Sequence, residues 1–110
     1  MTSAAAAGEP IYVSPITAWE IGMLTARRRI SLSIAPDEWF ERLLALPGIL
    51  LAPLSPKILI ASQFLPGTPP NDPADRIIAA TARDLDATLV TRDGLLLTYG
   101  QRGHVRVQAC

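Results

Sequence analysis

Two aspartates, Asp75 and Asp93, are the residues of this chain whose types and spacing best suit chemistry. Asp75 falls in the first turn of a predicted helix, and Asp93 directly follows a predicted buried strand. In an open α/β sheet such a helix starts at the edge where the strands end, and ligands bind there. Two carboxylates at one edge repel each other. A divalent cation that prefers oxygen ligands, Mg²⁺ or Mn²⁺, would relieve that repulsion.

A third acid, Glu20, lies on the apolar side of another predicted helix. It comes four residues after Ile16 and four before Leu24, so it shares their face. A carboxylate on a buried face is costly unless it is paired or binds a cation. We therefore expect Glu20, Asp75 and Asp93 to converge on one cleft, with carboxyl groups within about 12 Å, because ligands of one ion cannot lie far apart.

Each acid also has a purely structural interpretation. Asp75 at the third helical position would interact favourably with free N–H groups and the helix dipole. Asp93-Gly94 is an ordinary turn pair. Glu20 has candidate ion-pair partners in Arg27–Arg29, since arginine is the usual mate of a buried acid. Spacing alone leaves both interpretations open.

The elements that must position these acids alternate between strands and helices. Asp72 is a good N-cap and Pro73 suits the first helical position, so the helix of Asp75 begins there. The alternation predicts an α/β fold with a mostly parallel sheet and right-handed crossovers. Strands are expected at 11–13, 49–54, 88–91 and 105–107. Helices are expected from residue 15, over 36–46, over 57–64, from 73 to about 85, and over 95–99. In the first helix, the inward stripe is predicted to be Ile16, Trp19, Met23 and Leu24.

Composition predicts one modest globular domain. The chain has 110 residues, 49% of them hydrophobic, and no net charge, so no overall field attracts nucleic acid. Its one cysteine, Cys110, and one histidine, His104, make an internal disulfide or a histidine-based zinc site improbable. No apolar run is long enough to span a membrane and no signal peptide is evident, so we expect a cytoplasmic protein without membrane contact.

Four segments, taken in order, resemble PIN-domain proteins of the VapC type, the toxins of bacterial toxin–antitoxin pairs. They are IYVSPITAWEIGML, WFERLLALPGILLAPLSP, NDPADRIIAATA and TLVTRD. The resemblance implies a three-layer α/β domain over residues 11–110, with a mostly parallel central sheet flanked by helices, preceded by an alanine-rich remnant at 1–10. It also implies an endoribonuclease dependent on Mg²⁺ or Mn²⁺, with RNA as substrate, a cognate antitoxin as partner, and a homodimer.

The resemblance also implies roles for individual residues. Glu20 matches the acid of the tryptophan-containing helix, Asp75 the acid before the IIAATA-like run, and Asp93 the acid after the last strand of the site. Thr91 matches a small hydroxyl residue that often lies beside that acid, and Asp72 supports the site as the helix cap.

Two arginines, Arg76 and Arg92, flank the two aspartates. They could contact the RNA backbone, because arginine recognises phosphate bidentately. Solvent-exposed surface arginines are the alternative interpretation.

One part of the family pattern has no match. Members open with an apolar strand ending in an aspartate, whereas this chain begins MTSAAAAGEP, and Glu9 is the only acid before Glu20. An internal start, a fragment or a truncated copy would each explain this. We therefore expect self-association or dependence on a partner, and little RNA cleavage by this chain alone. The alternatives are an inactive PIN domain that acts only through antitoxin binding or self-association, and an unrelated α/β domain whose acids are caps and turns.

Overall fold

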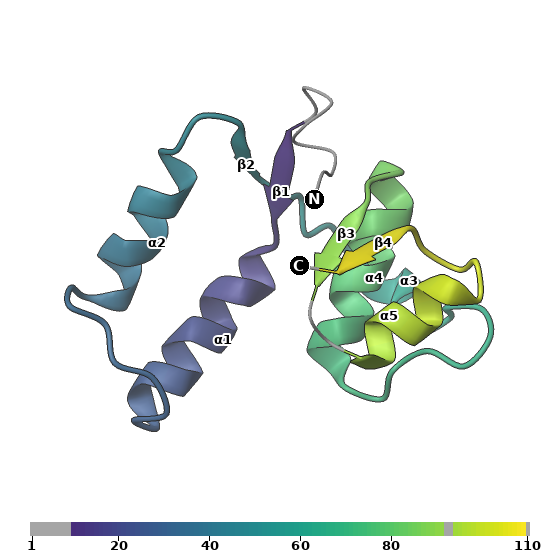
Figure 1. Ribbon diagram of the computed structural model, residues 1–110, viewed down its shortest axis with the longest axis horizontal. Coiled ribbons are helices and arrows are strands. Elements are labelled where there is room, and N and C mark those ends of the chain that lie inside the picture. The colour runs from purple at the N-terminus through teal and green to yellow at the C-terminus, as the bar shows by residue number, and fades with distance from the viewer. Residues whose placement is uncertain (1–9, 92–93, 110) are drawn as a thin grey trace.

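The computed structural model describes residues 10–91 and 94–109 (Figure 1). Strands and helices alternate along the chain, as the sequence predicts. The elements are β1 (Ile11–Val13), α1 (Pro15–Ala26), α2 (Pro36–Leu44), β2 (Ile49–Leu51), α3 (Pro56–Ala61), α4 (Pro73–Leu85), β3 (Leu89–Thr91), α5 (Gly94–Gln101) and β4 (Val107–Ala109).

Three helices begin with a capping side chain followed by a proline. The Ser14 hydroxyl accepts from the Ile16 amide at 3.1 Å, and the Ser55 hydroxyl accepts from the Ile58 amide at 3.2 Å. Asp72 caps α4 in the same manner. The proline at the first helical position has the φ a helix needs and lacks an N–H that would otherwise be unpaired. The predicted starts of α1 and α4 are therefore confirmed.

Some predicted boundaries were wrong by a few residues. β2 ends at Leu51 rather than at residue 54, since Pro53 cannot donate to a strand ladder. α3 ends at Ala61, where the Ser62 hydroxyl turns back to donate to the Leu59 carbonyl at 2.6 Å. The terminal strand lies two residues later than predicted, because Val105 is a buried core residue that precedes it.

All strand pairing in the described part of the chain is parallel. β1 pairs with β2, with Ile11 opposite Ile49, and β3 pairs with β4, with Leu89 opposite Val107. Within residues 10–91 and 94–109 these four strands form two separate two-stranded sheets. In Figure 1, β1 and β3 are the neighbouring strands of the two sheets, and both run from the top of the view downwards.

The core is built on the small residues of α4. Ala79, Ala80, Thr81 and Ala82 are all buried. The Thr81 hydroxyl donates to the Ile77 carbonyl at 2.8 Å, so its burial leaves no unpaired donor. Small side chains let neighbouring elements approach the helix closely, and α1 and α3 both pack on α4.

A second cluster joins α4 to the C-terminal elements. Ala82, Tyr99 and Val105 are buried together. Tyr99 is 1% exposed, and its hydroxyl donates to the Pro66 carbonyl at 2.5 Å, so the proline-rich loop before α4 is held against α5.

The predicted inward stripe of α1 is only partly correct. Ile16, Met23 and Leu24 are half-buried, but Trp19 is 59% exposed, and no residue of α1 is fully buried. Trp19 lies at the margin of the contact between α1 and α4, beside Ile77, where nothing covers its outer side. No helix in the described residues is long and apolar enough to cross a membrane.

Two helical glycines provide a matched test of this packing. A Cβ on Gly100 would lie 2.1 Å from Cγ2 and 2.8 Å from Cβ of Val107, a stiff β-branched residue, whereas a Cβ on Gly22 would meet nothing within 4 Å. We expect Gly100→Ala to lower the free energy of unfolding by about 1–3 kcal/mol through overpacking. Gly22→Ala should raise it by about 0.5–1 kcal/mol, because alanine is the better helix former. Urea unfolding measures both; a stabilised Gly100→Ala protein would show that α5 and β4 do not pack this closely.

Candidate acidic site

The contact between α1 and α4 brings two acids, Glu20 and Asp72, into electrostatic range. Glu20 lies on α1 and is partly buried. This burial raises the pKa of Glu20 above its usual value, and the negative charge of Asp72 raises it further. Asp72 comes from the start of α4, 52 positions later in the sequence. The negative charge of Asp72 therefore acts on Glu20, the acid predicted on the apolar face of α1.

The Asp72 carboxylate is held by the helix that it caps. Its Oδ1 accepts from the backbone amides of Ala74 at 2.8 Å and Asp75 at 3.2 Å. Both N–H groups belong to the positive end of the helix, which stabilises a negative charge. Glu20 is the acid whose ionisation is made costly, by burial and by the Asp72 charge.

Asp75 lies in the first turn of α4, the helix that Asp72 caps. It is half-buried, and it follows the cap by three residues, as the sequence predicts. The N-terminal end of α4 consequently carries two carboxylates, those of Asp72 and Asp75.

The remaining predicted site residues lie at or beyond the end of β3. Thr91 is the last residue of that strand and is in register with Ala109. Asp93 and Arg92 lie outside the described residues. The convergence of Glu20, Asp75 and Asp93 on one cleft therefore stays a prediction.

The alternative partner for Glu20, an arginine of Arg27–Arg29, is not supported. The ion pairs found among residues 10–91 and 94–109 include Arg42–Glu38, Lys57–Asp84 and Arg106–Asp86, and none of these involves Glu20. Arg27 caps the C-terminus of α1, where a basic residue suits the helix dipole. The raised pKa of Glu20 agrees with an acid that no arginine neutralises.

Arg76 has a structural contact that sequence reasoning missed. Its Nε donates to the Pro70 carbonyl at 2.6 Å, and the residue is half-buried rather than exposed. The contact holds the end of the proline-rich loop against the first turn of α4. The signal in the sequence was weak: a buried proline before the cap leaves a carbonyl that needs a donor.

The described acids have the right chemistry for a hard divalent cation but do not complete a site by themselves. Carboxylate oxygens are the ligands that Mg²⁺ and Mn²⁺ prefer, and a cation near Glu20 and Asp72 would offset their repulsion. No group of three or more histidine, cysteine, aspartate or glutamate residues in the described part of the chain is arranged to hold a metal ion.

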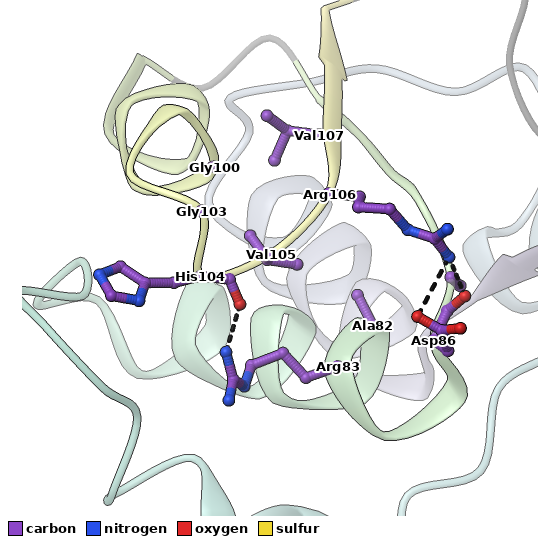
Figure 2. Close-up of a pocket in the computed structure, with 10 residues that line it drawn as sticks. Ala82, Arg83, Asp86, Gly100, Gly103, His104, Val105, Arg106 and Val107 are labelled. Carbon is purple, nitrogen blue, oxygen red and sulfur yellow. Dashed lines mark hydrogen bonds and ion pairs between the residues drawn. The ribbon is translucent and has the colours of Figure 1, made fainter.

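A cavity of about 390 Å³ lies near the other end of α4 and contains no acid cluster. Figure 2 shows the residues that line it. Arg83 donates to the His104 carbonyl, and Arg106 contacts both the backbone carbonyl and the carboxylate of Asp86 (Figure 2). Both arginines are thus used to attach the segment before β4 to α4. The arginines that line this cavity have structural roles, so it is not a second candidate site.

Comparison with known proteins identifies related chains. A family model described as PIN domain matches residues 2–99. The chain is 31% identical over 91 residues to Ribonuclease VapC22 of Mycobacterium tuberculosis (strain ATCC 25618 / H37Rv), an alignment that covers 83% of this chain and 68% of that protein. No solved structure matches at a significant level. The range matched by the family model includes Glu20, Asp75 and Asp93.

Substitutions at Asp72 should separate its role as a cap from its role as a charge. Asparagine caps a helix about as well as aspartate but is neutral, so we expect Asp72→Asn to keep α4 intact and lower the pKa of Glu20. Asp72→Ala should lower that pKa as well, and also cost about 1 kcal/mol of stability through the lost cap. An NMR titration of the Glu20 carboxyl, together with urea unfolding, measures both effects. An unchanged Glu20 pKa in Asp72→Asn would show that the two acids do not interact.

Glu20→Gln should stabilise the protein at neutral pH. The pKa of Glu20 is raised in the folded state, so folding favours its protonated form, and stability is lost as pH rises from the unfolded value of 4.5 through the folded value. Glutamine removes this penalty, so the gain in Tm should be present at pH 7 and fade below pH 4.5. Glu38→Gln, which changes an exposed acid paired with Arg42, is the matched control and should not stabilise.

Proposed function

Since the chain belongs to the PIN-domain family and is of the VapC type, we propose that it is a metal-dependent endoribonuclease that hydrolyses RNA phosphodiester bonds. The observation that best supports this proposal is the effect of the Asp72 charge on Glu20, since Asp72 caps the helix whose first turn contains Asp75. Among the described residues Glu20 has no arginine partner in an ion pair, and a partly buried acid without such a partner suits a cation.

We assign the metal-binding role to Asp75, Asp93 and Glu20, with Mg²⁺ or Mn²⁺ as the ion. When bound, such an ion lowers the pKa of a water molecule and neutralises charge that develops on the phosphate. Asp75 is the principal ligand in this assignment, and Asp93 binds directly or through water. Asp72 positions the first turn of α4 through its two backbone hydrogen bonds.

Glu20 has the properties of a group that handles a proton. The pKa of Glu20 is raised, so it lies closer to neutral pH than the pKa of an ordinary glutamate, and this suits a general base. Its carboxylate would complete the ligand set or orient the attacking water by accepting a hydrogen bond from it. The contact with Asp72 therefore tunes Glu20 as well as attracting a cation.

Arg76 and Arg92 are the proposed contacts to the RNA backbone. Because Nε of Arg76 already donates to Pro70, this arginine has only its terminal nitrogens left for a phosphate. Fixing the guanidinium in this way reduces the entropy that it loses on binding. Thr91, at the end of β3, supports the segment that leads to Asp93.

We also propose protein partners, a cognate antitoxin and a second copy of the chain, which this protein would meet in the cytoplasm. Several large apolar side chains are exposed, which is unfavourable unless a partner covers them. Among them are Trp19 at 59%, Ile60 at 63%, Phe64 at 80% and Leu95 at 64% exposed. The same observation favours the second candidate function, an inactive PIN domain that acts only by binding such a partner.

Metal binding distinguishes the two candidates. We expect Mn²⁺, followed by calorimetry, to bind the purified chain weakly, and Asp75→Asn to weaken binding by about ten-fold or more, because each carboxylate supplies both a ligand and a charge. Asp84→Asn is the matched control on the same helix: Asp84 lies near its other end and pairs with Lys57 at 3.4 Å. It should bind Mn²⁺ as the parent chain does.

Cleavage of a labelled RNA in Mg²⁺ or Mn²⁺ tests the activity itself. Any cleavage should be lost in Asp75→Asn and retained in Asp84→Asn. Equal Mn²⁺ affinity in all three proteins, with no cleavage, would overturn the nuclease proposal in favour of the inactive domain.

A further inference from the structure

Three consecutive arginines, Arg27, Arg28 and Arg29, form the turn that follows α1, and all three are exposed. Figure 1 shows this turn at the outer end of the α1–α2 pair, away from α3, α4 and α5. Within the described residues, no side-chain hydrogen bond or ion pair is found for these arginines, and the acids that begin α2, Asp37 and Glu38, do not pair with them. We call these three residues the arginine turn.

Most other basic residues in the described part of the chain have a protein partner. Arg42 and Lys57 pair with acids, and Arg76 donates to a backbone carbonyl. Arg83 and Arg106 attach the segment before β4 to α4. These contacts account for their guanidinium and ammonium groups, whereas the guanidinium groups of the arginine turn have no such structural use.

The backbone of the arginine turn favours glycine at the position of Arg28. The Arg29 amide donates to the Leu24 carbonyl at 2.9 Å, and the Arg28 amide donates to the Thr25 carbonyl at 3.0 Å. These two bonds define the Schellman motif, whose middle residue has a positive φ and is usually glycine. Arg28 has a φ of 57°. This conformation brings the Cβ of a residue other than glycine too close to the following carbonyl oxygen, so it costs free energy.

Arg28 is an exception among the positive-φ residues of the described chain. The others are Gly48, Gly67 and Gly103, which have no Cβ, and Asp86, whose short polar side chain tolerates this conformation. Backbone strain of this kind occurs at sites that bind ligands. An arginine at a position that its backbone disfavours therefore points to a use for its side chain.

The arginine turn is also aligned with the candidate acidic site. Arg27 follows Glu20 by seven residues, or two helical turns, so both lie on the same face of α1. A rise of 1.5 Å per residue places Arg27 about 10 Å further along the helix. Phosphates of one nucleic-acid strand follow each other at about 3.4 Å along a helix axis, so this separation corresponds to about two to three nucleotides.

The chemistry of the arginine turn fits a phosphate backbone better than a protein surface. Arginine recognises phosphate through paired N–H groups. Protein interfaces, in contrast, have a core rich in aromatic and other apolar side chains. No large apolar side chain is exposed in the described stretch 20–45, which contains this turn. Charge alone, without an apolar centre, is typical of binding to the backbone of a nucleic acid.

We propose that Arg27, Arg28 and Arg29 bind phosphates of an RNA strand that runs along α1 from the acidic site to the arginine turn. The relation to the cleaved bond rests on the proposed function, but binding of the RNA backbone requires neither a metal ion nor cleavage. Because phosphate contacts carry no sequence information, this site should increase affinity for RNA of any sequence.

The salt dependence of RNA binding tests the proposal. The probe is a fluorescein-labelled RNA of twelve uridines, followed by anisotropy in EDTA so that no cleavage intervenes. Replacing all three arginines by glutamine should weaken binding by about ten-fold or more at low salt. It should also reduce the slope of log affinity against log salt by about 2, since each phosphate contact on a single strand contributes about 0.7.

A second triple variant is the matched control. Arg42→Gln, Lys57→Gln and Arg102→Gln together remove the same number of exposed basic charges outside the arginine turn, so both variants have the same net charge. This control should keep most of the affinity and of the slope. Equal losses in the two triple variants, or no RNA binding by the parent chain, would overturn the proposal.

Substitutions of Arg28 should change stability and RNA binding in opposite directions. Arg28→Gly should raise the Tm, because glycine adopts a φ of 57° without strain, and should weaken probe binding by about three-fold or more. Arg28→Lys keeps the charge and the strained backbone, so its Tm and affinity should stay close to those of the parent. A raised Tm with unchanged affinity in Arg28→Gly would show that the arginine is not used for RNA and would contradict the proposal.

NMR maps the path of the strand. The probe should shift amide signals of α1 from Glu20 to the arginine turn, and leave that of Lys57 on α3 unchanged. Shifts confined to the turn would refute a strand that runs along α1. A peptide of twelve glutamates that displaces the probe at equal concentration would assign the arginine turn to an acidic polypeptide instead of RNA.

Failure of the nuclease proposal has a different signature. It would appear as absent cleavage and unchanged Mn²⁺ affinity in Asp75→Asn, while the probe still binds in EDTA and still depends on the arginine turn. Failure of the present proposal would appear as an unchanged salt slope in the triple arginine variant, whatever the cleavage assay shows.

Discussion

Close packing against the small side chains of α4 is the constraint on which the rest of this structure depends. Four consecutive residues, Ala79 to Ala82, are buried on that helix. Alanine and threonine bring little apolar area, so they stabilise the fold by allowing close approach rather than by filling space. Larger residues there would push α1 or α3 away and, with them, the elements that they carry.

The same helix links the packing to the chemistry. Its first turn contains Asp72 and Asp75, and its contact with α1 brings Glu20 toward them. Asp72 accepts from the two amides that it caps, and its negative charge adds to the burial that raises the pKa of Glu20. A structural device, the N-cap, thereby sets the protonation behaviour of a residue on another helix. Perturbed acids of this kind are typical of functional sites, although structural networks produce them too.

Local signals explain why much of the fold could be predicted. A capping residue followed by proline determines the start of a helix from neighbouring residues alone, and the starts at Pro15 and Pro73 were predicted correctly. The exposure of Trp19 and the division of the strands into two pairs depend on which elements meet in space. Sequence patterns carry no such information, so those features were missed.

The candidate site likewise has some features that local sequence predicts and others that depend on which elements meet in space. The placement of Asp75 in a first helical turn is local and was predicted from the cap. The charge of Asp72 acting on Glu20, and Arg76 donating to Pro70, arise from the way that α1 and a proline-rich loop lie against α4. Asp72 had been expected only as a supporting cap. The position of Asp93 relative to these acids stays a prediction.

The dependence of α1 on α4 also has a consequence for synthesis of the chain. Ribosomes release the N-terminal elements first, so β1, α1, α2 and β2 emerge before the helix against which α1 packs. About fifty residues separate Glu20 from Asp72, and contacts so distant in sequence form late because a long loop must close first. During that interval the apolar faces of α1 and β1 lack their native cover. The nascent N-terminal half therefore exposes apolar surface of α1 until α4 has been synthesised.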